Sequence, residues 1–138
     1  MKDNCIFCKI AAGEIPSYTV YEDDDFKAFM DIAPASKGHT ILIPKKHADN
    51  IFDLDETVAS KLLPVASKIA RALKEELDCD GLNLLQNNGE IAGQTVFHLH
   101  MHLIPRYKDD KVVVKWVQDK YEGEPLDQLS EKIKSKIR

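Results

Sequence analysis

Between His98 and Ile104 the sequence reads HLHMHLI, so that histidine alternates with large apolar residues. This period of two is typical of a β-strand with one buried face, and it predicts that His98, His100 and His102 lie on the same face. At a rise of about 3.3 Å per residue, the first and third imidazoles start about 13 Å apart. Each imidazole can donate, accept or attack near neutral pH. The run therefore predicts a chemical site in which histidines are held side by side.

Two kinds of chemistry fit such a strand, and a chance histidine-rich strand is the plain alternative to both. A His-x-His pair can offer two imidazoles to a catalytic zinc ion. All three histidines can hardly reach one ion, because a zinc–nitrogen distance is about 2.1 Å. At most two neighbours and a residue from elsewhere would chelate a metal. Without a metal in the reaction, the central His100 is the natural nucleophile, attacking through a neutral ring nitrogen.

The loop before the histidines offers groups that can hold phosphate oxygens. Asn87, Gly89, Gly93, Gln94 and Thr95 provide backbone amides, side-chain amides and a hydroxyl. Such groups bind phosphate oxygens without a metal. A glycine-containing loop is a weak signal alone, but this one leads directly into the histidine run. Together the two segments indicate chemistry at a phosphate group.

Strand patterns in the rest of the chain predict an antiparallel sheet that positions these groups. Apart from the histidine run, strands are expected at Tyr18–Tyr21, Phe26–Met30, His39–Pro44 and Leu82–Gln86. The acidic residues 22–25 form the turn of a hairpin between the first two strands. With the helices described next, this order of elements indicates an α+β fold.

Three helices are expected. A short one begins near Cys5 and is stopped by Gly13. The longest covers Asp55–Leu77, with an acidic first turn and Pro64 inside, which is expected to kink the helix or to mark a late start. Beyond a charged tail, apolar residues at positions 126, 129, 133 and 137 predict an amphipathic helix.

Length and composition limit the class of protein. The chain has 138 residues, of which 43% are hydrophobic and 30% charged, and this favours a single domain over residues 1–138. Its net charge of −4 provides no basic field for nucleic acid. No apolar run approaches the ~20 residues that span a bilayer, and the N-terminus is polar rather than signal-like. Three cysteines are an odd number and argue against a disulfide framework. We therefore expect no nucleic-acid or membrane partner, and a cytoplasmic location.

Taken together, these motifs resemble the histidine triad (HIT) superfamily. The HLHMHLI run matches its signature at every position. The resemblance extends to Asp31-Ile32, Gly38-His39, the IPKKH segment at residues 43–47, Asn87-x-Gly89 and Gly93-Gln94-Thr95. It covers about residues 5–107 and is strongest to the Hint-like branch, in a bacterial form with an N-terminal Cys-x-x-Cys. It implies a five-stranded antiparallel sheet per subunit with one long helix, and sheets joined across a homodimer.

The resemblance also implies roles for the histidines. His100 is expected to attack the α-phosphorus of a nucleoside monophosphoryl group and to form a covalent nucleotidyl-histidine, which water then hydrolyses. His102 and His98 complete the triad, and His39 corresponds to a supporting fourth histidine. A backbone carbonyl near His98 is expected to hold the far nitrogen of His100, so that the attacking nitrogen stays unprotonated.

Further residues resemble the nucleotide-binding groups of the family. Asp31 resembles the carboxylate that binds ribose hydroxyls, although a turn carboxylate is the alternative. Asn87, Gln94 and Thr95, with the adjoining Gly93, correspond to contacts with the phosphate and the leaving group. Trp116 lies in the unmatched tail, as an interface residue or a leaving-group contact. An apolar wall around a purine base corresponds to six residues, for which plain core packing is the alternative: Ile6, Phe7, Ile10, Ile15, Phe29 and Ile32.

The pair Cys5-x-x-Cys8 has three interpretations. A redox pair normally follows a strand in a βαβ unit, and only four residues precede this one. Chance thiols are the second interpretation. The third is a structural zinc, which needs two more ligands. The resemblance implies that His47 and His98 supply them, as in some Hint-like proteins, so that zinc orders the site and takes no part in the chemical step.

The expected function is a hydrolase or transferase that acts on a purine nucleoside phosphoramidate or a related nucleotide conjugate and releases a nucleoside monophosphate. A dinucleoside polyphosphate hydrolase is the alternative within the same fold. From another class, a nucleotide-binding adaptor with incidental hydrolysis also fits the sequence. The leaving group and the physiological substrate are not encoded in these motifs.

Overall fold

The computed structural model describes residues 2–138, which fold into an α+β domain. The first half of the chain contains α1 (Ile6–Ala11), β1 (Thr19–Glu22), β2 (Phe26–Met30), β3 (Thr40–Pro44) and the 3-10 turn η1 (Ile51–Asp53). The second half contains α2 (Glu56–Leu77), β4 (Gly81–Leu85), the 3-10 turn η2 (Glu90–Ala92), β5 (Met101–Arg106) and α3 (Leu126–Lys136).

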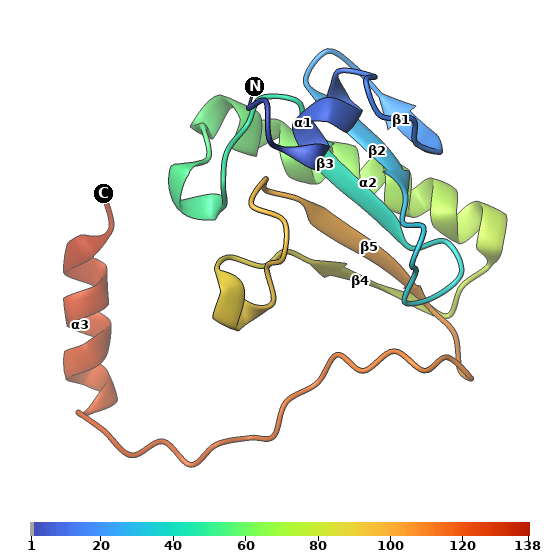
Figure 1. Ribbon diagram of the computed structural model, residues 1–138. Coiled ribbons are helices and arrows are strands. Elements are labelled where there is room, and N and C mark those ends of the chain that lie inside the picture. The colour runs from blue at the N-terminus through green and yellow to red at the C-terminus, as the bar shows by residue number, and fades with distance from the viewer. Residues whose placement is uncertain (1) are drawn as a thin grey trace.

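The strands form one five-stranded sheet in the order β1-β2-β3-β5-β4, and every neighbouring pair is antiparallel. The long helix α2 covers one face of this sheet, and the short helix α1 lies against the other (Figure 1). The core under α2 contains Phe26, Ala28, Leu42, Leu99 and Leu103 from the strands and the segment before β5. The predicted α+β fold with a five-stranded antiparallel sheet and one long helix is confirmed.

Capping side chains and a left-handed residue define the ends of α2. The Asp55 carboxylate accepts hydrogen bonds from the backbone N–H groups of Thr57 and Val58, which have no partner within the helix. At the other end Asp78 adopts φ 47° and stops the helix. Pro64 does not cause a late start, because the helix runs through it from Glu56. Pro64 is exposed, so the carbonyl that loses its helical partner can bond to water.

The histidine run is only partly a strand, which corrects the expectation of a strand from His98 onward. β5 begins at Met101, which pairs with Leu42 of β3. Further along β3 stands Pro44, which has no N–H to donate, and its carbonyl accepts from the His98 ring at 2.8 Å. The N–H of Leu99 donates to the Ala48 carbonyl at 2.7 Å instead. At this end of the sheet, hydrogen bonds to the His98 side chain and to the loop residue Ala48 therefore replace the strand-to-strand hydrogen bonds.

Gly38 allows the end of α2 to pack against the turn before β3. Its φ is +92°, a conformation that residues with a Cβ rarely adopt. A Cβ at this position would also clash with Leu77 Cδ1 and lie 3.2 Å from Pro105 Cγ. The close approach places the next residue, His39, immediately before β3, whose first residue Thr40 pairs with Leu103 of β5.

The C-terminal helix α3 stands apart from the sheet, at the end of an extended arm (Figure 1). The predicted amphipathic helix is confirmed over Leu126–Lys136, but none of its residues is buried. Trp116 in the arm is 82% exposed. Among the described residues, no helix is long and apolar enough to cross a membrane.

Candidate active site and metal centre

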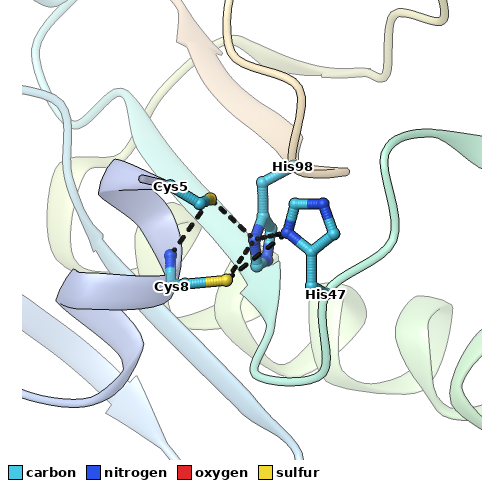
Figure 2. A group of neighbouring side chains, drawn as sticks. All are labelled: Cys5, Cys8, His47 and His98. Atoms are coloured by element: carbon cyan, nitrogen blue, oxygen red, sulfur yellow. Dashed lines mark hydrogen bonds between the residues drawn. The ribbon is translucent and has the colours of Figure 1, made fainter. Parts of the chain in front are cut away.

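Two cysteines and two histidines from distant parts of the chain converge beside α1 (Figure 2). The Sγ of Cys5 lies 3.4 Å from His98 Nδ1, and the Sγ of Cys8 lies 3.4 Å from His47 Nδ1 and 3.5 Å from His98 Nδ1. The two Nδ1 atoms are 3.1 Å apart. Ligands at about 2.0–2.3 Å from a tetrahedral zinc lie about 3.3–3.8 Å from one another. The cluster therefore has close to the size of a Cys₂His₂ zinc site.

The outer hydrogen bonds of these two histidines show that the cluster suits a cation. The Nε2–H of His98 donates to the Pro44 carbonyl at 2.8 Å, and the Nε2–H of His47 donates to Asp49 Oδ1 at 2.7 Å. With the proton on Nε2, each neutral ring has only a lone pair on Nδ1. Two lone pairs at 3.1 Å cannot bond to each other, but both can bind one metal ion. The residues present therefore fit a zinc ion.

His100 is held in the tautomer that a nucleophile needs. Its Nδ1 lies 2.8 Å from the backbone carbonyl of His98. Because a carbonyl only accepts, the ring proton is on Nδ1 and the lone pair is on Nε2. The ring is buried and packs edge-on against Phe7, with centroids 5.0 Å apart. This is the carbonyl contact that the family resemblance implied.

A second chain of hydrogen bonds orients His102. The N–H of Ala35 donates to Nδ1 of His39 at 3.0 Å, so neutral His39 is protonated on Nε2. That Nε2–H lies 2.9 Å from Nδ1 of His102, which therefore accepts and has its own proton on Nε2. Asp31 Oδ2 lies 3.6 Å from His39 Nε2. The ligand atoms of this trio also lie within 4.8 Å of one another, but the His39 nitrogen facing the other two has a proton and no lone pair.

A cavity of about 360 Å³ opens beside His100 and His102. It brings together all six apolar residues of the predicted wall and Asp31, although Ile32 and Ile6 remain 85% and 49% exposed. Thr95 of the predicted phosphate group also lines it. Further lining residues had no motif in the sequence: Pro16, Ser17, Tyr18, Met30, Ile41 and Val96.

These features match known proteins. Residues 12–109 match the model of the HIT domain family, which is more than half of the chain. The chain belongs to the HIT family. Protein hit of Bacillus subtilis is 48% identical over 138 residues, which cover 98% of this HIT protein and 95% of the relative. Adenosine 5′-monophosphoramidase hnt1 of Schizosaccharomyces pombe is 40% identical over 136 residues, covering 98% and 99% of the two chains.

Solved structures of the family extend the comparison to the fold. A crystal structure of a member of the HIT family from Bacillus subtilis has a TM-score of 0.92 and 46% identity, and the match covers 99% of each chain. A Zn-bound histidine triad family protein from Mycobacterium smegmatis has a TM-score of 0.76 and 39% identity, with 84% of each chain covered. The family recognised from the HLHMHLI motif is confirmed.

In this HIT protein, the residues that were predicted to contact phosphate lie in different environments. Gly93 has φ +100°, and a Cβ there would lie 3.2 Å from Asn87 Nδ2, so these two residues meet. Gln94, expected to contact phosphate, is instead 1% exposed. Its Oε1 accepts from Gly89 N–H, and its Nε2 donates to the carbonyls of Asp49 and Val96. Gln94 therefore holds the loop together, and Thr95 is the member of the group that reaches the cavity.

Burial keeps the site histidines neutral near pH 7. It is the largest cause that lowers the pKa of His98 and of His102 to about 4, and it also lowers the pKa of His100 and His39. For His102 the neighbouring imidazoles His100 and His39 add to the effect, while Asp31 opposes it. Neutral rings keep the lone pairs and tautomers described above available at physiological pH.

Acidification is expected to remove the contribution of His102 to stability. The pKa of an unfolded histidine is about 6.5, and that of folded His102 is about 4. The unfolded state therefore binds the proton first, and the contribution of the neutral ring is lost as the pH falls from 6.5 towards 4. Urea unfolding of the wild type and His102→Gln at pH 7, 5.5 and 4.5, with zinc supplied, measures the difference in unfolding free energy. We expect the unfolding free energy of the wild type, relative to that of His102→Gln, to decrease at low pH. A difference that stays constant with pH would contradict the prediction.

Proposed function

We propose that this HIT protein is a hydrolase that attacks the α-phosphorus of purine nucleoside phosphoramidates through His100 and releases a nucleoside monophosphate. The observation that carries the proposal is the tautomer of His100, because the carbonyl of His98 leaves the lone pair on Nε2. This ring lines the cavity together with His102 and Asp31. The similarity to adenosine 5′-monophosphoramidase hnt1 supports the same class of substrate.

The nucleoside occupies the 360 Å³ cavity. Its base packs between apolar side chains of α1 and β2, such as Phe7, Ile10 and Phe29. The ribose hydroxyls donate to Asp31, whose Oδ1 already accepts the N–H of Ala33 at 2.8 Å and is thereby held in place. This arrangement directs the α-phosphate towards His100 and Thr95.

In the first half-reaction the lone pair of His100 Nε2 forms a bond to phosphorus while the bond from phosphorus to the leaving nitrogen breaks. The electron pair of that bond goes to the leaving nitrogen, which has taken up a proton from solvent beforehand and departs as a neutral amine, while the Nε2–H of His102 donates a hydrogen bond to a phosphate oxygen. The new positive charge on His100 is stabilised by its Nδ1–H bond to the His98 carbonyl. The product is a covalent nucleotidyl-histidine.

In the second half-reaction water attacks the same phosphorus. The water gives one proton to the solvent as its oxygen bonds to phosphorus, and the Nε2–H of His102 again donates to a phosphate oxygen. The bond between phosphorus and His100 Nε2 breaks, and its electrons return to the ring as the lone pair. His102 keeps its proton on Nε2 throughout, as the hydrogen bond from His39 requires. The nucleoside monophosphate then leaves.

The proposed zinc holds the site in shape. Cys5, Cys8, His47 and His98 would hold the ion, whose role is to order structure and not to polarise the phosphate. A metal ion bound through His98 Nδ1 would fix the residue whose backbone carbonyl orients His100. The relative from Mycobacterium smegmatis, which is Zn-bound, supports zinc as the metal.

We also propose that residues 1–138 form a single domain that acts as a homodimer in the cytoplasm. The exposed apolar face of α3, with Leu126 and Ile133 64% and 54% exposed, supports a second subunit as its partner. Cys5, Cys8 and Cys79 form no disulfide, which favours a reducing compartment. A molecular mass measured in solution tests the dimer.

Intact mass spectrometry of an acid-quenched reaction tests the proposed mechanism. We expect that mixing the protein with adenosine 5′-phosphoramidate yields a transient adenylyl adduct, mapped to His100, and free AMP. His100→Gly should form neither, because it lacks the attacking nitrogen. Cys79→Ser, which changes a buried thiol outside the site, should retain both products.

The possible failures have separate meanings. Nucleotide binding without adduct or AMP would indicate the binding-protein alternative. AMP without an adduct at any quench time would indicate direct attack by water. Faster turnover of a diadenosine polyphosphate than of the phosphoramidate would favour the dinucleoside polyphosphate hydrolase.

A further inference from the structure

A second cavity adjoins the nucleotide cavity at its phosphate end. It has a volume of about 410 Å³ and shares Ile6, Thr95 and Val96 with the first cavity. Its other walls come from the N-terminal segment, the loop after β3 and the residue before His98. They are Lys2, Asn4, Cys5, Asp49 and Phe97. The two cavities therefore meet at Thr95, close to the histidines.

The course of the proposed reaction gives this second cavity a role. In phosphoryl transfer the leaving group departs roughly in line with the attacking atom, on the opposite side of phosphorus. The nucleoside fills the cavity that contains His100, so the leaving group has to extend beyond it. The shared residue Thr95 marks a route into the second cavity.

The two charged side chains of the second cavity, Asp49 and Lys2, are not held equally firmly. The Asp49 carboxylate is fixed, because its Oδ1 accepts the Nε2–H of His47 at 2.7 Å. The Lys2 ammonium approaches the same oxygen at 3.4 Å. Both side chains are about half exposed, at 56% for Lys2 and 44% for Asp49, and such ion pairs are weak. A ligand cation can therefore replace the lysine.

Lys2 itself shows what this position accepts. Its backbone N–H is tied to Cys8 Sγ at 3.4 Å, and its side chain brings a primary ammonium on an alkyl chain to Asp49. Within residues 2–138, the hydrogen bonds and ion pairs of the Asp49 carboxylate all fall on Oδ1, so Oδ2 can accept a hydrogen bond from a ligand. Val96 and Phe97 supply apolar wall for an alkyl chain.

We propose that the second cavity is a leaving-group subsite for alkylamines that have a second, protonated amino group. The distal ammonium displaces Lys2 and pairs with Asp49, while the proximal nitrogen is the one bonded to phosphorus. This inference rests on the proposed hydrolysis of phosphoramidates. It adds a preference in the leaving group that the histidines themselves do not determine.

Three adenosine 5′-phosphoramidates test the subsite, with propylamine, 1,3-diaminopropane or β-alanine as the leaving amine. They place a methyl group, an ammonium or a carboxylate at a similar distance from phosphorus. We expect the wild-type kcat/KM to be about five-fold higher for the diamine than for propylamine, the order expected of one exposed ion pair, and lowest for β-alanine. Equal values for the three would overturn the subsite and leave the hydrolase standing. Turnover of none of them would overturn the hydrolase and the subsite together.

Two variants with opposite expected effects separate a binding role from a structural one. Asp49→Asn keeps an oxygen for His47 and loses the charge, so the preference for the diamine over propylamine should fall to about one. Lys2→Met removes the competing cation, so the preference should rise above that of the wild type. Asp24→Asn, an exposed carboxylate in the β1–β2 turn, is the control for net charge and should leave the preference unchanged.

The test still gives an answer if Asp49→Asn changes the structure of the site. The zinc content of Asp49→Asn is measured alongside its kinetics, because Asp49 supports His47. Where that variant loses zinc, the Lys2→Met result decides the question. A preference that does not rise in Lys2→Met overturns the proposal.

Discussion

Replacement of His100 by alanine is expected to lower kcat/KM for adenosine 5′-phosphoramidate by about 10⁴-fold or more, the scale seen when a covalent nucleophile is removed. The imidazole is the group that attacks, and its tautomer is set by the His98 carbonyl at 2.8 Å. Asp31 and the apolar wall remain in this variant, although Phe7 loses its edge-on contact with the ring. The affinity for AMP should therefore change by only a few-fold. Steady-state kinetics and calorimetric titration with AMP measure the two quantities.

The combination of lost turnover and retained binding distinguishes an enzyme from a nucleotide-binding adaptor. Residual activity close to the wild-type value would assign the hydrolysis to another group and favour the adaptor. Because His100 packs against Phe7, the melting temperature of the variant must be measured as well. His100→Gln, which fills more of the space and also lacks a nucleophilic nitrogen, should show the same kinetic loss. A loss restricted to the alanine variant would indicate a packing defect.

The chemistry of the site was predictable where residue type and spacing determine it. The HLHMHLI run and Cys5-x-x-Cys8 contain the reactive and ligating side chains directly in the sequence. The family resemblance then predicted which distant residues join them, and the structure brings His47 to the cysteines and His39 to His102. The first and third histidines, His98 and His102, belong to two separate clusters, which agrees with a spacing along the chain that was too long for one metal.

Other features depend on contacts that no local pattern records. Gln94 has a side-chain amide of the kind that can bind phosphate, but this amide already forms hydrogen bonds with three backbone groups. Met30, Ser17 and Val96 line the cavity because the hairpin and the loop meet α1 there. The position of Pro16, Ser17 and Tyr18 in the sequence, next to a residue already expected in the apolar wall, could have indicated that they lie near the cavity. It could not have indicated what they do there.

The fold followed from periodicity, and its exceptions arise from side chains that compete with the backbone. The bounds of β2 agree with the predicted Phe26–Met30, and β3 begins one residue later than predicted, at Thr40. The histidine strand starts three residues later than its alternation predicts, at Met101. There the ring of His98 donates a hydrogen bond to the Pro44 carbonyl. Such a bond requires the tertiary structure and leaves no trace in the period of two.

Removal of zinc is expected to affect stability much more than the chemical step. The protein as purified should contain about one zinc per chain, and Cys8→Ser should lose it, because a hydroxyl is a poor replacement for a thiolate ligand. We expect the melting temperature to fall by about 10 °C or more. This corresponds to a few kcal/mol in a domain of this size and is less than the binding free energy of a zinc finger, since a separate core remains under α2. Metal analysis and calorimetry measure both effects.

Cys79→Ser is the matched control for this substitution. Cys79 is also buried, at 1% exposure, but it does not belong to the cluster. Its variant should keep one zinc per chain, whatever the hydroxyl costs in packing. Equal zinc content in Cys8→Ser and the wild type would remove the Cys₂His₂ assignment.

Chelation of the wild type separates a structural zinc from a catalytic one. The ion would lie on Nδ1 of His98, whereas the attacking nitrogen belongs to His100, which His98 reaches only through its backbone carbonyl. At temperatures well below the lowered melting point, the zinc-depleted protein should therefore still form the adenylyl adduct, although more slowly because His98 is less well held. Complete loss of the adduct in a folded, zinc-depleted protein, reversed by added zinc, would instead place the metal in the chemical step.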